Sequence, residues 1–265
     1  MQTTRLPIPN LDAAAVSDRG LKRSTNEDSV LCDPILGVFA IADGMGGHAS
    51  GEVASRLAIE TVHTWWRNAQ QRWRSQGLDR PHHRQLLNES IVAANQEVLR
   101  RSRSCDLFAG MGTTLLVTVL HEMTLHYAHV GDSRLYRLHG GQLSLLTRDH
   151  TVAQWRLDLG LCTEAEARAS SGAHRLTRAI GMDTDCGVEL AECQCEPGDG
   201  FLLCSDGLNH ELHDEQIAEE WRHAMHRADS ADSLCRRLIE KANQAGGRDN
   251  ISVVALHLCA QTQST

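Results

Sequence analysis

Four consecutive segments between residues 113 and 146 alternate apolar and polar side chains with a period of two. They read TTLLVTVLHE, MTLHYAHVGD, SRLYRLHGG and QLSLL, and each follows the one before after no more than a short turn. Such alternation is typical of strands that bury one face, and short connections between them favour antiparallel pairing. The run therefore predicts an antiparallel meander of four strands, whose apolar face needs a second layer to cover it.

Further strands are expected on both sides of this run, and helices near each end of the chain. The additional strands are predicted at 13–17, 29–33, 36–43, twice within 187–207, and at 250–258. Apolar residues recur at helical spacing over 51–74, 84–104, 214–226 and 230–245. Residues 149–170 are helical in pattern but poor in apolar side chains, so we expect them to lie over a surface.

Two helices near the front, two near the back and nine or ten strands predict an α+β fold. Because each sheet has an apolar face to bury, we expect two antiparallel sheets packed face to face with helix pairs on the outer faces. This is a four-layer α-β-β-α sandwich. The length of 265 residues fits one large domain, so we expect residues 1–265 to form a single domain.

Composition excludes several classes of protein. The net charge of −8 argues against the nucleic-acid backbone as a main partner. No apolar stretch approaches the roughly 20 residues that a membrane span needs, and the first 17 residues lack the apolar core of an export signal. The nine cysteines are an odd number without a disulfide framework spacing. They are expected to be reduced in a cytoplasmic protein.

Carboxylates recur at the ends of the predicted strands. They are Asp43 in VFAIAD, Asp132 in AHVGD, Asp206 in FLLCSD, Asp249 directly before the last strand, and Glu27 and Asp28 before the second. Any one of them alone is more typical of a turn. Several side chains at strand ends of packed sheets can converge on one cleft, where they repel each other unless cations lie between them. Ligation by oxygen alone suits Mg²⁺ and Mn²⁺.

A cluster of this kind can hold two metal ions about 3.5–4 Å apart, the arrangement used for in-line attack on phosphorus. Gly44 follows Asp43 and lets its backbone carbonyl approach an ion. Arg23 lies four residues before Glu27, and its forked donors suit a phosphate group. Considered alone, Arg23 is better explained as a solvated arginine in a polar loop.

The stretch IADGMGGHAS at 41–50 leaves three interpretations open: a nucleotide cradle, an Asp-Gly hairpin turn, or a metal site. Residues 44–49 fit G-x-G-x-x-G/A, but a dinucleotide fold requires a short helix, a parallel strand and an acidic residue about 20 positions on. Here a helix of more than 20 residues and then a second helix follow. An NAD-dependent oxidoreductase is therefore disfavoured, and protection by NAD against thermal unfolding would identify one.

Two other short motifs are better explained by chance. CTEAEAR at 162–168 fits the C-x5-R loop of cysteine phosphatases, but Glu164 and Glu166 would repel a phosphate, and Thr163 with Glu166 is typical of a helix capping box. HEMTLH at 121–126 places its histidines five residues apart, so they cannot share the face of a zinc-protease helix.

Eight blocks of the sequence resemble, in order, those of the metal-dependent Ser/Thr protein phosphatases of the 2C type. The blocks are RGLKRSTNED (19–28), DGMGGH (43–48), MGTTLL (111–116), VGDSRLYR (130–137), LTRDHT (146–151), LTRAIG (176–181), LLCSDGL (202–208) and GGRDNISVV (246–254). The resemblance extends over roughly residues 15–258 and is closest to the compact bacterial members. It implies the same sandwich of two antiparallel sheets flanked by helix pairs.

The resemblance also implies roles for individual residues. Asp43 would bridge two catalytic Mn²⁺ or Mg²⁺ ions, with Asp206 and Asp249 completing the ligands of the first and the Gly44 carbonyl binding the second. Asp132, together with Asp206, would hold a third ion. Arg23 would bind the substrate phosphate, Glu27 and Asp28 would orient water, and residues 148–180 would form a flap that influences substrate choice. A non-catalytic regulator on this scaffold would have lost metal ligands, whereas this chain keeps them all.

The function implied is hydrolysis of phosphoserine and phosphothreonine in proteins by direct attack of a metal-activated water. The implied partners are a Hanks-type kinase and its phosphorylated substrates, and the protein is expected to act as a monomer in the cytoplasm. One position departs from some family members. Met45 stands where they carry a histidine proposed to protonate the leaving oxygen, so the acid is unassigned.

Overall fold

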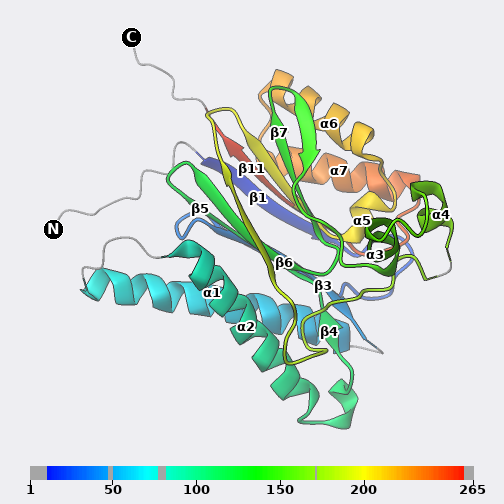
Figure 1. Ribbon diagram of the computed structural model, residues 1–265. Helices are drawn as coiled ribbons and strands as arrows, with labels where there is room; N and C mark the ends of the chain where they lie inside the picture. Colours follow the sequence, from blue (N-terminus) through cyan, green and yellow to red (C-terminus); the bar gives the residue numbers. More distant parts are fainter. Residues whose placement is uncertain (1–10, 47–49, 77–81, 171, 260–265) are drawn as a thin grey trace.

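The strands form two antiparallel sheets that pack face to face between two pairs of helices (Figure 1). The computed structural model describes residues 11–46, 50–76, 82–170 and 172–259. The expected four-layer α+β sandwich is therefore confirmed.

The two sheets draw their strands from both ends and the middle of the chain. In spatial order, the five-stranded sheet contains β1 (Leu11–Asp18), β11 (Ile251–Leu258), β10 (Gly200–Cys204), β7 (Arg134–His139) and β8 (Gln142–Leu145). The six-stranded sheet contains β2 (Asp28–Asp33), β3 (Val38–Met45), β5 (Leu115–His121), β6 (Thr124–Val130) and β9 (Glu189–Gln194), while β4 (Gly112–Thr113) pairs with the end of β3.

The apolar run of β3 is explained by burial on both of its faces. Val38, Ala40 and Ala42 pack toward the helices, whereas the alternate residues Phe39 and Ile41 pack between the sheets. Opposite them, β10 and β11 contribute apolar side chains such as Phe201 and Val254. The layer between the sheets therefore fixes the position of both sheets, and hence of the loops at their ends.

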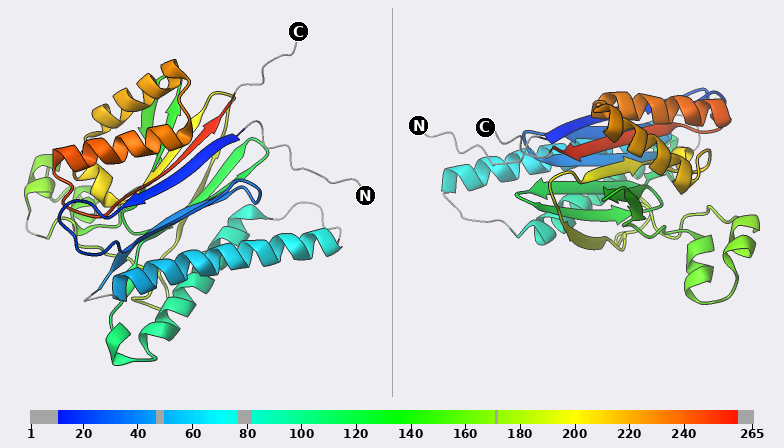
Figure 2. Two further views of the ribbon diagram at one scale, coloured as in Figure 1. Left: turned by 180° about the vertical axis from the view of Figure 1, so that it is seen from behind. Right: turned by 90° about the horizontal axis from the view of Figure 1, so that it is seen from above.

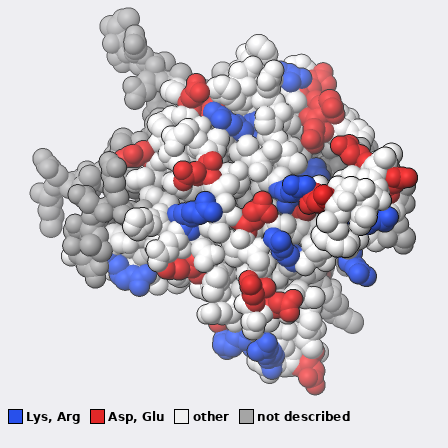
Figure 3. Space-filling model, viewed as in Figure 1, with Lys and Arg blue, Asp and Glu red and all other residues white. Residues whose placement is uncertain are grey.

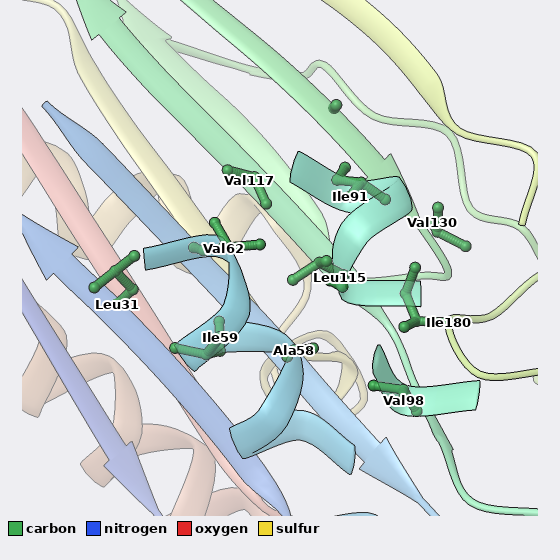
Figure 4. Packing of buried hydrophobic residues seen from close by; sticks show 14 of the residues in the cluster. Leu31, Ala58, Ile59, Val62, Ile91, Val98, Leu115, Val117, Val130 and Ile180 are labelled. Carbon is green, nitrogen blue, oxygen red and sulfur yellow. The ribbon is translucent and has the colours of Figure 1, made fainter. Parts of the chain in front are cut away.

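Each outer face of the sandwich is covered by a pair of helices. The six-stranded sheet is covered by α1 (Ser50–Gln76) and α2 (His83–Ser102), and the five-stranded sheet by α6 (Asp214–Arg227) and α7 (Ala231–Ala245). In Figure 4, Ile59 of α1 lies near Leu31 of β2, Val62 of α1 lies near Val117 of β5, and Ile91 of α2 lies near Leu115 of β5. Among the described helices, none has the length and apolarity needed to cross a membrane.

Charged side chains are dispersed over the face of the protein that Figure 3 shows. The Lys and Arg side chains described on this face lie singly or in small groups among Asp and Glu side chains. Nucleic-acid-binding proteins usually present a basic stripe or patch instead. The described Lys and Arg side chains on this face therefore form no continuous basic surface.

The predicted four-stranded meander is wrong. The structure contains two hairpins in different sheets, β5–β6 and β7–β8, because β6 pairs with β9 whereas β7 pairs with β10. The chain crosses between the sheets at residues 131–133. Gly131 has φ +109°, and a Cβ there would lie 2.6 Å from the Thr114 Cγ2 atom, so the crossing requires glycine. Period-two alternation identifies a strand but does not specify which sheet receives it.

Residues 149–170 form two short helices, α3 (Val152–Asp158) and α4 (Glu164–Ala169), instead of one helical segment. The predicted capping box is present: the Thr163 side chain accepts from the Glu166 backbone, and the Glu166 carboxylate accepts from the Thr163 backbone. The two helices project from one end of the sandwich (Figure 2). Shorter elements are the helix α5 (Asp206–Asn209) and the 3₁₀ turn Asp106–Phe108.

Candidate metal centre

Four of the predicted carboxylates are delivered to one region by the ends of strands. Asp28 begins β2 and lies directly opposite Asp43 in the β2–β3 pairing. Asp206 follows β10 as the first residue of α5, and Asp249 lies two residues before β11. Because β10 and β11 are neighbours in the opposite sheet, both sheets contribute carboxylates to the same end of the sandwich.

The pKa values indicate that these carboxylates act on one another. Loss of hydration raises the pKa of Asp43 well above its usual value, and the charges of Asp28, Asp206, Asp132 and Asp249 raise it further. Burial raises the pKa of Asp28 to about 7, against the opposing effect of hydrogen bonds from Ser252 and Ser205. The sequence therefore gathers negative charge that the protein alone does not neutralise.

Asp132 joins the group from the crossing between the sheets. It is buried, with 7% of its surface exposed. Burial raises the pKa of its carboxyl group, followed by the charges of Asp206 and Asp149. Asp132 therefore interacts electrostatically with Asp206.

Among the described residues, two buried carboxylate oxygens have no hydrogen-bond partner, namely Oδ1 of Asp28 and Oδ1 of Asp206. Burying an anionic oxygen without a partner is costly, because it loses its hydration and gains nothing in return. The other Asp28 oxygen accepts from the Ser205 hydroxyl at 2.8 Å. An oxygen-only set with unpaired anionic atoms fits a hard divalent cation such as Mn²⁺ or Mg²⁺.

Gly44 is required by a close approach between β3 and α1. A Cβ at this position would lie 2.2 Å from the Gly51 carbonyl oxygen and 2.6 Å from that of Glu27. The Gly44 N–H donates to the Glu27 carbonyl at 3.1 Å. The glycine thus holds the Asp43 end of β3 against both the start of α1 and the loop that carries Glu27. Residues 47–49, at the end of the possible dinucleotide fingerprint, lie outside the described residues.

Arg23 lies beside the carboxylates, as expected. Its Nη2 atom is 2.7 Å from Oδ2 of Asp249, while half of its side chain is exposed. The charge of Arg23 lowers the pKa of Glu27, although burial is the larger effect and raises it overall. A partly exposed guanidinium at the rim of an anionic pocket is placed to meet an incoming anion.

A sequence model of the family described as protein phosphatase 2C matches residues 22–241. The chain belongs to this family. It is similar to the serine/threonine protein phosphatase PstP of Mycobacterium tuberculosis, at 38% identity over 91% of this chain. The match spans 44% of the length of PstP. A protein phosphatase 2C-type protein of Streptococcus pyogenes is 33% identical over 91% of this chain and 95% of its own.

A solved structure extends the comparison to the metal centre. The crystal structure of the PstP catalytic domain in complex with two manganese ions matches this chain with a TM-score of 0.79 and 35% identity. The match covers 94% of this chain and 99% of that one. The fold of this phosphatase 2C chain therefore resembles that of a relative whose structure holds two manganese ions.

A cleft of about 970 Å³ in this phosphatase 2C chain runs from the carboxylates to the segment predicted as the flap. The residues that line it include Asp132, Asp206 and Asp249, together with Arg148 and Gln154. Across it, the His210 Nε2 atom of the α5 end lies 3.1 Å from the His174 Nδ1 atom. Residues 148–180 thus border the site, and His174 contacts His210 directly.

Three residues that organise the phosphatase 2C site were missed from the sequence. Asn250 accepts from the Glu27 N–H at 2.8 Å and donates to the carbonyls of Arg19 and Thr25, both at 2.9 Å, so it fastens the loop that carries Arg23. Ser205 connects Asp28 to the backbone of Ser252. Thr114 accepts from the Asp43 N–H at 2.9 Å. The sequence could have pointed to them because each lies directly beside a predicted ligand or within one of the eight blocks that resemble the family.

Among the described residues, the compact group whose ligand atoms all lie within 4.8 Å of one another consists of His129, His150 and Glu189. It is not the carboxylate cluster. The Gly131 N–H donates to Nδ1 of His150, so the ring proton lies on Nε2, which faces Glu189 at 3.2 Å. Arg178 Nη1 also lies 3.3 Å from Nε2. Glu189 and the Arg178 guanidinium therefore already contact the Nε2 atom of His150 that a cation would bind.

Proposed function

We propose that this chain hydrolyses phosphoserine and phosphothreonine in proteins, using two divalent ions held by the carboxylate cluster. The observation that carries the proposal is the convergence of Asp43, Asp206 and Asp249 with an unpaired buried oxygen on Asp206. The names of the similar proteins, including a relative solved with two manganese ions, support the same activity.

We expect each residue of the cluster to bind a particular ion. Asp43 would lie between the two ions, Asp206 and Asp249 would hold the first, the Gly44 carbonyl would bind the second, and Asp132 with Asp206 would hold a third. When bound, Mn²⁺ or Mg²⁺ supplies a water of lowered pKa and offsets the charge of the phosphate. The protein's own part is to orient that water and the substrate.

Arg23 would bind the substrate phosphate. Its Nη2 atom contacts Asp249, and its half-exposed side chain leaves further donors of the guanidinium accessible from solvent. Glu27 and Asp28 would orient water. The unpaired Asp28 Oδ1 atom is available to accept a hydrogen bond from it. These groups hold the attacking oxygen and the phosphorus in line, which is the main requirement of phosphoryl transfer.

The substrates proposed are phosphorylated proteins, including a Hanks-type kinase and its targets, with residues 148–180 acting as a flap that influences substrate choice. We also propose that residues 1–265 are one domain and that the protein works as a monomer in the cytoplasm. All nine cysteines are free, and free thiols are usual in proteins of a reducing compartment.

The test is release of phosphate from a phosphothreonine peptide, with and without Mn²⁺. Asp206→Ala and Asp249→Ala are expected to abolish release. Asp232→Ala is the matched control, because Asp232 is an exposed carboxylate on α7 that pairs only locally with Arg236. Mn²⁺-dependent release that survives both site substitutions would show that the hydrolytic centre lies elsewhere.

A further inference from the structure

We infer that His150 is a positioning residue that couples the proposed flap, residues 148–180, to the carboxylate of Asp132. Its two ring nitrogens have different tasks: Nδ1 holds the loop that carries Asp132, and Nε2 holds the base of the flap. The inference rests on the proposed function, because it takes Asp132 as a ligand of the third ion and residues 148–180 as a flap.

His150 pairs with both backbone groups of Gly131, the residue directly before Asp132. The Gly131 N–H donates to Nδ1 of His150 at 3.1 Å, and the His150 N–H donates to the Gly131 carbonyl at 3.0 Å. Gly131 is buried at the crossing between the sheets, where its φ is +109°. A buried N–H needs an acceptor. Loss of Nδ1 would therefore leave this turn free to change its backbone angles and, with them, the direction of the Asp132 side chain.

The neighbouring contacts make this pairing part of a continuous connection. Arg134, on the far side of the crossing, donates to both carboxylate oxygens of Asp149 at the start of the flap, at 2.9 Å from Nε and 2.7 Å from Nη2. Within the crossing, the hydroxyl oxygens of Ser133 and Thr114 lie 2.8 Å apart. The loop is thus held between β5 and the start of the flap, so a shift of the flap base would reach the Asp132 carboxylate.

His150 also lies where the two ends of the flap meet. The Thr177 N–H donates to the His150 carbonyl at 2.8 Å, and Thr151 forms an isolated β-bridge with Leu176. The segments that begin and end the flap therefore lie side by side. His150 belongs both to this junction and to the pairing with Gly131.

The Nε2 atom of His150 faces the end of the flap and the start of β9. Because Nδ1 accepts, the ring proton lies on Nε2, which is 3.2 Å from Oε2 of Glu189 and 3.3 Å from Nη1 of Arg178. The ring is 6% exposed and stacks on His129 with 4.6 Å between centroids. Burial lowers the pKa of His150 to about 4, so the ring is neutral at physiological pH. A neutral imidazole accepts on one side and donates on the other, as both contacts require.

The two tasks can be separated by substitution, because asparagine and glutamine each reproduce one ring nitrogen. The Asn Oδ1 atom can take the place of Nδ1 and accept from Gly131, whereas the Gln amide reaches the place of Nε2. Titration calorimetry with Mn²⁺ measures the affinity of the two tighter ions and of the weaker third ion. We expect His150→Gln to weaken the third ion at least tenfold, and His150→Asn to keep its affinity within about threefold of the parent chain. Neither variant should change the tighter affinities by more than about twofold.

A second readout follows the flap itself. Coupling between two sites is reciprocal, so an ion at Asp132 should in turn stabilise the flap. In the parent chain, amide hydrogen exchange of α3 (Val152–Asp158) should slow several-fold as the third ion binds. This slowing should disappear in Asp132→Ala and in His150→Gln. In His150→Asn, which lacks the Nε2 contact, α3 should exchange faster than in the parent chain although the third ion still binds.

The matched control is His126→Gln, since His126 is a partly buried histidine near the start of the same strand β6, where it lies 3.1 Å from Glu192. It should leave the third-ion affinity unchanged. Unfolding temperatures in EDTA identify any variant that fails to fold.

Three results would overturn the inference: equal third-ion affinity in His150→Gln and the parent chain, equal losses in His150→Asn and His150→Gln, or no third Mn²⁺ ion in the parent chain. A loss in His126→Gln as large as that in His150→Gln would do the same, because it would show a general loss of stability. A parent chain that binds Mn²⁺ but releases no phosphate from a phosphothreonine peptide would contradict the proposed function instead. The comparison of the His150 variants would still decide the inference in that case.

Discussion

Replacing Asp28 by asparagine should stabilise the metal-free protein while reducing its activity. Asp28 is buried, with 8% of its surface exposed, and it lies opposite Asp43. Its pKa is raised from 3.8 to about 7. A group whose folded-state pKa is raised above its unfolded value binds more protons when folded, so for this acid the stability present at low pH is lost as the pH rises from about 4 to about 7.

The magnitude follows from the width of this interval. Each pKa unit corresponds to about 1.36 kcal/mol, so the full shift is equivalent to about 4 kcal/mol at pH 8. At pH 5 the stability that corresponds to about one pKa unit has already been lost. About 3 kcal/mol of pH-dependent destabilisation therefore remains between pH 5 and pH 8. An asparagine side chain at this position cannot ionise, and it keeps an oxygen acceptor for the Ser205 hydroxyl.

The assay is thermal unfolding of parent and Asp28→Asn in EDTA at pH 5 and pH 8. The advantage of the variant should widen by about 3 kcal/mol over this range, on the order of 10 °C for a chain of this size. Saturating Mn²⁺ should reduce the difference, because the ions offset the same repulsion. Parallel pH profiles for the two proteins in EDTA would refute the argument that ionised Asp28 opposes folding.

Three further substitutions test other contacts of the site. Gly44→Ala should cost about 3 kcal/mol, since its Cβ would meet the backbone of Gly51 at 2.2 Å, and an unchanged unfolding temperature would contradict this packing. Asn250→Ala removes hydrogen bonds to Glu27 and two loop carbonyls. It should lower the free energy of unfolding, measured by chemical denaturation, by about 2–3 kcal/mol and raise KM for the phosphopeptide. Arg23→Ala should raise KM for a phosphothreonine peptide at least tenfold and leave the Mn²⁺ activation constant nearly unchanged. If only the Mn²⁺ activation constant changed, the role of Arg23 would be to position Asp249 and not to bind the phosphate.

The layers of the fold could be predicted because each strand and helix has its own periodicity. Phe39 and Ile41 alternate with Val38 and Ala40, and both sets are buried, which requires a layer on each side of β3. The sheet membership of the strands from 113 to 146 could not be predicted in this way. It depends on Gly131, whose left-handed backbone turns the chain from one sheet to the other, and on pairing with β9 and β10 far along the sequence.

The candidate site shows the same limit at a finer scale. The types of the carboxylates and their positions at strand ends suggested an oxygen-rich cation centre, because strand ends are where packed sheets can bring side chains together. The residues that hold these ligands in place could not be inferred from the sequence, because their partners are distant along the chain. Asn250 is 223 positions from Glu27, to which it is hydrogen-bonded, and Ser205 is 177 positions from Asp28.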